Sequence, residues 1–471
     1  MSSHHLQVLL IGLCLLPMSA GSTGPADRQT DAALSGGATT VQADGTGAFS
    51  LPAANTSLLR RDSFFIGNAF FKQPWVTAPA STKARDGLGP LFNANSCQGC
   101  HIRDGKGEAL SKPGPGPHSV LVRLGRSPAN PAEQAQVRSN GTVPDPVYGD
   151  QLQPNGIPGV DGEGRLNLTL EPLPVRFADG ETVTLHQPVP TLTGLKYGPP
   201  APGLQTSVRA TPVMIGLGLL EAIPEADILA LADPGDADGD GISGRPNRVR
   251  DLSRQQTVLG RFGWKANQPS IAQQTAAAFH GDLGISSALF PDQPCTAAQT
   301  DCRQAPKGGE PEISAAIMAE VVFYASMLAV PARRDVDNPT VLQGQKLFEQ
   351  AGCASCHVPR FRTGSKPGFP ELENQLIQPF TDLLLHDMGP GLADGRPDFE
   401  ASGQEWRTAP LWGLGLVQTV NPQAGFLHDG RASTLMEAIL WHGGEAEAAQ
   451  RAVLGMDKAD RSALLRFLES L

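Results

Sequence analysis

Residues 95–107 read NSCQGCHIRDGKG, and residues 352–359 read GCASCHVP. Both segments contain the pattern Cys-x-x-Cys-His. The motif residues are Cys97, Cys100, His101, Cys353, Cys356 and His357. In this pattern the two thiols add to the vinyl groups of a haem, and the adjacent histidine becomes the proximal ligand of its iron. Two copies therefore predict two covalently bound haems c, with His101 and His357 on the irons.

A single Cys-x-x-Cys pair is also compatible with half of a zinc site or with a redox dithiol. Zinc-binding pairs usually lie about 15–20 residues apart, whereas much more of the chain separates Cys100 from Cys353. A thioredoxin-like dithiol needs a βαβ context, which is absent around either copy. Haem attachment is the preferred interpretation.

The composition indicates a folded, acidic protein. The 471 residues suffice for roughly two to four domains. Glycine and proline are abundant, with 53 and 41 residues, and predict long loops around compact helices. A net charge of -10 without a cluster of Lys and Arg argues against nucleic acid as a partner.

The N-terminus predicts export. Residues 1–20 are expected to be a signal peptide, because the apolar run Leu6–Leu16 has the length of a signal core and is too short to span a membrane. Lipid attachment at Cys14 is the less favoured alternative. Residues 21–54 are predicted to be a flexible leader, and the mature chain is expected in the periplasm without a transmembrane span. In an exported chain Cys295 and Cys302 are expected to form a disulfide rather than remain free thiols.

The periodicity predicts a mainly α fold with two cytochrome c-like haem domains. The N-terminal domain spans 55–330 and carries a β- and loop-rich insertion at about 118–200, which includes a hairpin over 165–186. The C-terminal domain spans 331–471. Helices are expected over 224–232, 270–280 and 312–328, after Asn338, after Thr434 and after Asp457.

A faint internal repeat links the two halves. Residues 209–218, RATPVMIGLG, resemble residues 407–415, RTAPLWGLG. Each copy follows one haem motif at a long interval, and each precedes a capped helix, after Ser270 or after Thr434. The repeat indicates two haem domains that descend from one unit.

The chain resembles the di-haem oxidoreductase branch of the bacterial di-haem cytochrome c peroxidase superfamily. The resemblance covers roughly residues 55–471. The segments that carry it are NSCQGCHIRDGKG, LGLLEAIPEADI, DADGDGISGRPN, GRFGWKA, FTDLLLHDMGPGLADG, RTAPLWGLG and FLHDGRASTLMEAILWHGG. It implies an oxidoreductase that reduces peroxide. The same superfamily includes the di-haem enzyme of methylamine-dehydrogenase maturation, which oxidises a protein, so the substrate stays open.

The resemblance implies a second ligand for the C-terminal haem. In the peroxidases, the segment that follows HDGRASTL supplies this ligand, usually a methionine. The matching residue here is His442, which implies His357/His442 ligation and a lower potential than a His/Met pair has. Met436 and Met388 are rival ligands. His386 and His428 are expected to be structural, near the haem propionates.

The corresponding helix of the N-terminal half lacks such a ligand. The position equivalent to His442 is Ala278, so the resemblance implies an open iron. The peroxidases have a distal glutamine and a distal glutamate in this segment. Gln274 matches the glutamine, and Asp282 or His280 is expected to replace the glutamate as the group that moves the proton.

Three further residues are weaker candidates at the N-terminal haem. His118 matches the spacing of a removable distal ligand in some peroxidases, although an ordinary surface histidine is the favoured reading. Glu221 is a second candidate acid. Trp264, in GRFGWKAN, is the preferred aromatic bridge between the haems.

An acidic segment offers a possible cation site. Asp236, Asp238 and Asp240 precede Gly241 with the spacing of a calcium loop. Position twelve is Asn247 instead of Glu, so an ordinary EF-hand is disfavoured. A calcium loop of another type and a plain Asp/Gly turn both remain open.

These observations predict an exported di-haem c oxidoreductase. Its partners would be a small redox protein or other electron donor, and peroxide or another substrate as yet unidentified. The alternative is a non-enzymatic di-haem electron-transfer protein in which both irons have six ligands.

Overall fold

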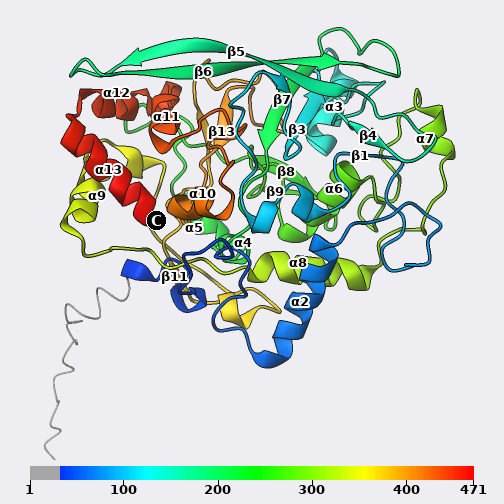
Figure 1. Ribbon diagram of the computed structural model, residues 1–471, viewed down its shortest axis with the longest axis horizontal. Helices are drawn as coiled ribbons and strands as arrows, with labels where there is room; N and C mark the ends of the chain where they lie inside the picture. Colours follow the sequence, from blue (N-terminus) through cyan, green and yellow to red (C-terminus); the bar gives the residue numbers. More distant parts are fainter. Residues whose placement is uncertain (1–31) are drawn as a thin grey trace, which may run out of the picture.

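The computed structural model describes residues 32–471, so the predicted signal peptide and Cys14 lie outside the described residues. Figure 1 shows the helices and a long hairpin that crosses one side of the molecule. The helices of the N-terminal half are α2 (Leu58–Lys72), α3 (Pro131–Asn140), α4 (Leu217–Glu221), α5 (Glu225–Leu229), α6 (Ile271–Leu283), α7 (Thr300–Gln304) and α8 (Ala315–Met327). Those of the C-terminal half are α9 (Pro339–Gln350), α10 (Val417–Val420), α11 (Leu435–Leu440), α12 (Glu447–Gly455) and α13 (Lys458–Ser470).

The strands form small antiparallel sheets of two or three strands. They are β1 (Leu91–Phe92), β2 (Gly114–Pro115), β3 (Val120–Gly125), β4 (Asn155–Gly156), β5 (Arg165–Arg176), β6 (Thr182–Thr193), β7 (Gln205–Ala210), β8 (Arg248–Asp251), β9 (Gln256–Leu259), β10 (Phe361–Arg362), β11 (Leu376–Ile377), β12 (Leu385–Asp387) and β13 (Glu405–Arg407).

The prediction of a mainly α fold is wrong. The structure is 30% helical and 18% strand, and no cytochrome c-like domain is evident among the described residues. The many Gly- and Pro-containing segments between the helices pair as short strands, which satisfies their backbone groups without helix. Helical periodicity identified the helices, but it carries no information about this pairing.

The two halves share a single large core. Its buried residues include Phe64 and Tyr324 from the N-terminal half and Trp406 and Trp441 from the C-terminal half. Residues 32–54, which belong to the predicted leader, also contribute, because Phe49 is fully buried in this core. This part of the leader is therefore packed against the folded body.

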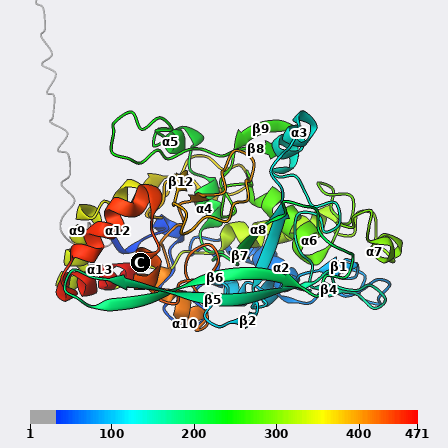
Figure 2. The same ribbon diagram turned by 90° about the horizontal axis from the view of Figure 1, so that it is seen from above.

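The predicted hairpin is present and is longer than expected. Strands β5 and β6 pair over their full length, from Arg165 opposite Thr193 to Arg176 opposite Thr182. The end of the hairpin reaches helix α13, where Arg461 forms ion pairs of 2.8 Å with Asp179 and 2.6 Å with Glu181. Figure 2 shows the hairpin running along the edge of the molecule to the helices of the C-terminal half.

The predicted helices occur close to their expected positions. Asn338, Thr434 and Asp457 each cap a helix through a side-chain oxygen. The helix expected over 224–232 is shorter and spans only Glu225–Leu229. Within the described part of the chain, no helix is both long enough and apolar enough to cross a membrane.

Candidate functional site

Both Cys-x-x-Cys-His motifs open onto one continuous cavity of about 670 Å³. In each motif the segment between the cysteines is a short 3-10 helix. Ser96 caps the first of these, because its hydroxyl accepts a hydrogen bond from the amide of Gly99 at 3.2 Å. The four motif cysteines are free thiols. Burial raises the pKa of Cys97 and of Cys100 to about 12, so both thiols stay protonated at neutral pH.

His101 is poised as a neutral imidazole in this cavity. Burial lowers its pKa to about 4, and the nearby carbonyl of Pro212 opposes this shift only in part. Its Nδ1 is buried and makes no hydrogen bond of ordinary geometry to the described residues. A neutral imidazole is the form that binds a metal.

His357 and His442 form a matched pair at the second motif. Nδ1 of His357 donates to the carbonyl of Phe380 at 2.9 Å, and Nδ1 of His442 donates to the carbonyl of Ala438 at 2.8 Å. Since carbonyl oxygens only accept, these bonds place the proton on Nδ1 and leave the lone pair on Nε2. Burial lowers both pKa values, that of His357 to about 4, and the charge of His442 lowers it further. The pair suits an iron with two histidine ligands.

The two methionines that were rival ligands, Met388 and Met436, and the histidine expected to be structural, His386, have different surroundings. Met388 lines the cavity, whereas Met436 packs in the core beside it. His386 lies between Asp382 at 2.8 Å and Glu445 at 2.7 Å. Burial alone would lower the pKa of His386, but its hydrogen bonds raise it to about 12. A protonated histidine held by two carboxylates fits the predicted structural role.

Helix α6 forms the wall of the cavity near the first motif. Ser270 caps it by accepting a hydrogen bond from the amide of Gln273. Gln274, Ala278 and Asp282 follow at intervals of four residues, lie on one face of the helix and line the cavity. His280 points elsewhere, because its ring stacks on Phe290 at 5.0 Å between centroids. Of the two expected proton-transfer groups, only Asp282 faces the cavity.

Asp282 is held by neighbouring polar groups. Gln151 donates to its Oδ1 at 2.9 Å and to the carbonyl of Gly281, also at 2.9 Å. Burial raises the pKa of Asp282, and the positive charge of Arg123 opposes this rise. Arg123 itself lines the cavity and lies 3.6 Å from Asp150. A carboxyl group with a raised pKa is suited to proton transfer near neutral pH.

Of the two weaker candidates His118 and Glu221, only His118 lines the cavity. His118 lines the cavity, and its backbone carbonyl lies 3.6 Å from the thiol of Cys100. Glu221 is structural, because its carboxylate accepts a hydrogen bond from the amide of Ile271 and is paired with Lys366.

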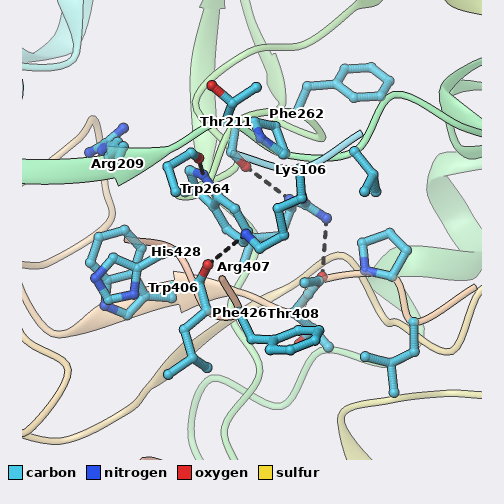
Figure 3. Close-up of a pocket in the computed structure, with 18 of the residues that line it drawn as sticks. Lys106, Arg209, Thr211, Phe262, Trp264, Trp406, Arg407, Thr408, Phe426 and His428 are labelled. Carbon is cyan, nitrogen blue, oxygen red and sulfur yellow. Dashed lines mark hydrogen bonds between the residues drawn. The ribbon is translucent and has the colours of Figure 1, made fainter. Parts of the chain in front are cut away.

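Aromatic side chains also line the cavity. Trp264 donates from Nε1 to the carbonyl of Ala210 at 2.8 Å, and Lys106 lies 4.5 Å above its ring. Trp406 also lines the cavity and stacks on His428 at 3.5 Å between centroids. Figure 3 shows these two ring systems beside the same space.

Two cations in this cavity were missed by sequence reasoning. Lys106 donates to the carbonyl of Leu427 at 2.8 Å, and burial lowers its pKa to about 7. Arg407 donates to the carbonyls of Gly263 and Thr408, and burial lowers its pKa to about 10. Neither forms an ion pair with a carboxylate of the described residues, and Figure 3 shows both beside the open space. Cations that line a cavity without a carboxylate in direct contact fit a ligand that carries carboxylates, such as the propionates of a haem. The sequence did draw attention to Arg407, because this residue begins the second copy of the internal repeat.

The acidic loop brings together a different set of carboxylates from the predicted one. Asp236 and Asp238 lie with Asp233, with ligand atoms within 4.8 Å of one another. Asp240 instead lines the cavity that the two motifs share. The loop carboxylates also accept hydrogen bonds from backbone amides, as Asp233 does from Ala237 at 2.7 Å. Calcium binding here stays a prediction.

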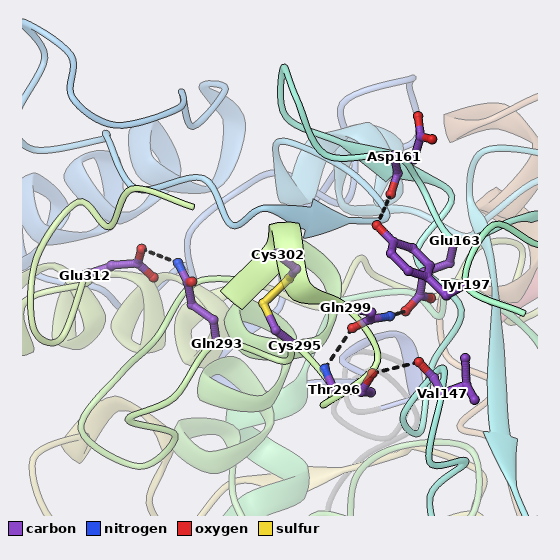
Figure 4. The surroundings of a disulfide bond; sticks show 10 residues. All are labelled: Val147, Asp161, Glu163, Tyr197, Gln293, Cys295, Thr296, Gln299, Cys302 and Glu312. Atoms are coloured by element: carbon purple, nitrogen blue, oxygen red, sulfur yellow. Dashed lines mark hydrogen bonds between the residues drawn. A yellow bond between two sulfur atoms is a disulfide. The ribbon is translucent and has the colours of Figure 1, made fainter. Parts of the chain in front are cut away.

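The predicted disulfide between Cys295 and Cys302 is confirmed, with a Cα–Cα distance of 5.7 Å. Figure 4 shows the loop that it closes beside the buried carboxylate of Glu163. Gln299, from this loop, donates a hydrogen bond to Glu163, and Thr296 donates to the carbonyl of Val147 at 2.8 Å. The bridge thus fixes the loop against the insertion of the N-terminal half.

The comparisons with known proteins agree with the geometry of the cavity. A search of curated proteins gave no significant match. A family model described as "Di-haem oxidoreductase, putative peroxidase" matches residues 29–471, nearly the whole chain. The family name indicates two haems, which accords with two histidine-bearing motifs on one cavity. The chain belongs to the di-haem oxidoreductase family.

Proposed function

We propose that this protein is an exported di-haem c oxidoreductase that reduces peroxide at the haem of His101. The thiols of each motif would hold one haem covalently. The haem of His357 and His442 would receive electrons from a small redox protein and pass them on. The disulfide between Cys295 and Cys302 supports export, since such bonds persist in oxidising compartments.

The observation that carries the proposal is the asymmetry between the two ends of the cavity. His442 lines the cavity with an Nε2 that is free to bind a metal, whereas Ala278, which matches it by position in the sequence, lines the same cavity with a methyl group. An iron with two strong protein ligands transfers electrons, and an iron with an open position can bind a substrate. The N-terminal end is therefore the reactive end.

The residues on α6 provide the proton chemistry. A bound haem supplies the electrons and the open iron position. Asp282, as a carboxylate, accepts the proton from the inner oxygen of hydrogen peroxide and returns it to the outer oxygen, which leaves as water. Gln274 orients the peroxide through its amide, and Gln151 holds Asp282 in place. Lys106 and Arg407, which line the cavity, would neutralise the propionates of a bound haem.

Peroxide consumption by the fully loaded protein tests this proposal. With a chemical one-electron donor present, the holoprotein should consume hydrogen peroxide, and Asp282→Asn should slow consumption strongly. Two irons that remain low-spin, without any peroxide consumption, would support a pure electron carrier and contradict the proposal.

A further inference from the structure

Tyr324 packs against two phenylalanine rings of helix α2 in the core of the N-terminal half. It belongs to α8, is fully buried, and its ring lies 4.8 Å from that of Phe64 and 5.2 Å from that of Phe71, both on α2. The two helices pack closely, since a Cβ at Gly67 would clash with the carbonyl oxygen of Glu320. Figure 1 shows α2 and α8 side by side. The ring of Tyr324 is therefore held in a fixed position.

The hydroxyl of Tyr324 donates to a buried carboxylate. The distance from this hydroxyl to Oδ1 of Asp104 is 2.6 Å, and the hydroxyl of Ser50 donates to Oδ2 at 2.5 Å. Asp104 is fully buried and forms no ion pair with the described residues. A carboxylate at this distance can accept the phenolic proton when the tyrosine loses an electron, because oxidation turns the phenol into a strong acid and the acceptor already lies within reach of the proton.

The other two tyrosines of the chain have different partners. Tyr148 donates to the carbonyl of Gly198 at 2.6 Å, and Tyr197 donates to the carbonyl of Asp161 at 2.7 Å. A backbone carbonyl accepts a hydrogen bond but is too weak a base to take the proton. Among the three tyrosines of the sequence, Tyr324 alone is paired with a carboxylate.

A chain of rings connects Tyr324 to the first haem motif and to the surface. On the inner side Phe71 lies 5.8 Å from the ring of His101. On the outer side Phe64 lies 5.6 Å from Phe65, which is 56% exposed. Tyr324 is the most easily oxidised side chain in this row, because the other members are phenylalanines and an imidazole.

We propose that Tyr324 is a redox-active relay that supplies an electron to the oxidised N-terminal haem and releases its proton to Asp104. The O–H bond of Tyr324 breaks, the carboxylate of Asp104 becomes a carboxylic acid, and one electron passes by way of Phe71 and His101 to the haem. The products are a neutral tyrosyl radical and a haem centre reduced by one electron. The oxidant is peroxide, so this inference rests on the proposed function.

Freeze-quench EPR of the haem-loaded protein after addition of hydrogen peroxide tests the relay. The expected result is a tyrosyl signal that Tyr324→Phe abolishes and that Tyr148→Phe and Tyr197→Phe leave unchanged. Asp104→Asn should remove the signal or shorten its lifetime, because the proton then lacks an acceptor. Haem absorption and thermal melting confirm that each variant is folded and loaded.

A second test retains Tyr324 and removes the other two tyrosines. In the double variant Tyr148→Phe/Tyr197→Phe, Tyr324 is the only tyrosine, and ring-deuterated tyrosine should narrow the radical signal. A signal that does not respond to this label, or that persists in Tyr324→Phe, overturns the proposal.

A photogenerated ruthenium(III) polypyridyl oxidant separates this inference from the proposed function. Peroxide that fails to change the haem absorption of the wild type contradicts the peroxidase function. The experiment with the ruthenium oxidant then still tests the relay, since light oxidises the haem-loaded protein without peroxide. A tyrosyl signal from Tyr324 in this experiment supports the relay, and its absence there contradicts it.

Discussion

Ala278 and His442 each lie eight residues after the residue that caps their helix, and both side chains line the same cavity. One of these positions carries an imidazole with a free Nε2, and the other carries a methyl group. The two helices therefore match in the position of their caps but differ in the side chain that they present to the cavity.

Exchange of these two side chains should exchange the behaviour of the haems. His442→Ala should convert the C-terminal haem from low-spin to high-spin, because it removes one of two histidine ligands. Ala278→His should make the N-terminal haem low-spin and suppress its reaction with peroxide. EPR and stopped-flow absorption measure both effects. Met436→Leu is the control and should change neither spectrum, since Met436 does not line the cavity.

Asp282→Asn should slow the reaction with peroxide by about 10²–10⁴-fold, the usual range for loss of a general acid–base group. Burial raises the pKa of Asp282, and only the carboxylate can accept the proton. The wild-type rate should therefore fall as the pH is lowered through this raised pKa. The rate of the variant should not show this dependence on pH. His280→Gln is the matched control on the same helix. A comparable loss of rate in that variant would refute the assignment.

Arg407→Gln should lower the reduction potential of a haem by an amount on the order of tens of mV. A positive charge favours the reduced state, and Arg407 lacks a carboxylate partner that would cancel its charge. Arg407→Lys keeps the charge and should leave the potential nearly unchanged. Spectroelectrochemical titration measures both variants, and equal potentials in wild type and Arg407→Gln would contradict a place beside the propionates.

The stability of the fold should fall as the pH rises toward 8, because of Glu163. Burial raises its folded-state pKa to about 8 from an ordinary value of 4.5. The folded state thus binds this proton more tightly, so the stabilisation is complete below about pH 4.5 and is lost as the pH rises through 8. The contribution to the slope is at most about 1.4 kcal/mol per pH unit. Urea titrations at several pH values should show a flatter profile for Glu163→Gln.

Removal of the disulfide should cost about 2–3 kcal/mol of unfolding free energy, as expected for a bridge between cysteines seven residues apart. The double variant Cys295→Ser/Cys302→Ser should melt at a lower temperature than the wild type. Its haem content should be unchanged, because the four motif thiols remain. Loss of haem in this variant would show that the loop has a role beyond holding the insertion in place.

Local signals in the sequence predicted local features well. The haem motifs, the capped helices, the hairpin over 165–186 and the disulfide all depend on residues that are close along the chain. The fold class was missed because it depends on the pairing of short strands that are distant in the sequence, such as β3 with β7. Such pairing leaves no helical or alternating pattern in segments of two to six residues.

The site was predicted only as far as spacing along a helix could predict it. Gln274, Ala278 and Asp282 share a face because they lie four residues apart, which also explains why His280 is on another side. Lys106 and Asp233 gave no comparable signal, because their partners come from remote segments or from a turn whose geometry a spacing rule does not describe.

EPR of the haem-loaded protein, oxidised and half-reduced, with and without hydrogen peroxide, tests the central asymmetry most directly. The account predicts a high-spin ferric signal that His442→Ala leaves in place and that peroxide removes, together with a low-spin signal from the haem of His357 and His442. Low-spin ferric signals alone, two in the oxidised protein and one in the half-reduced protein, none of them altered by peroxide, would contradict it.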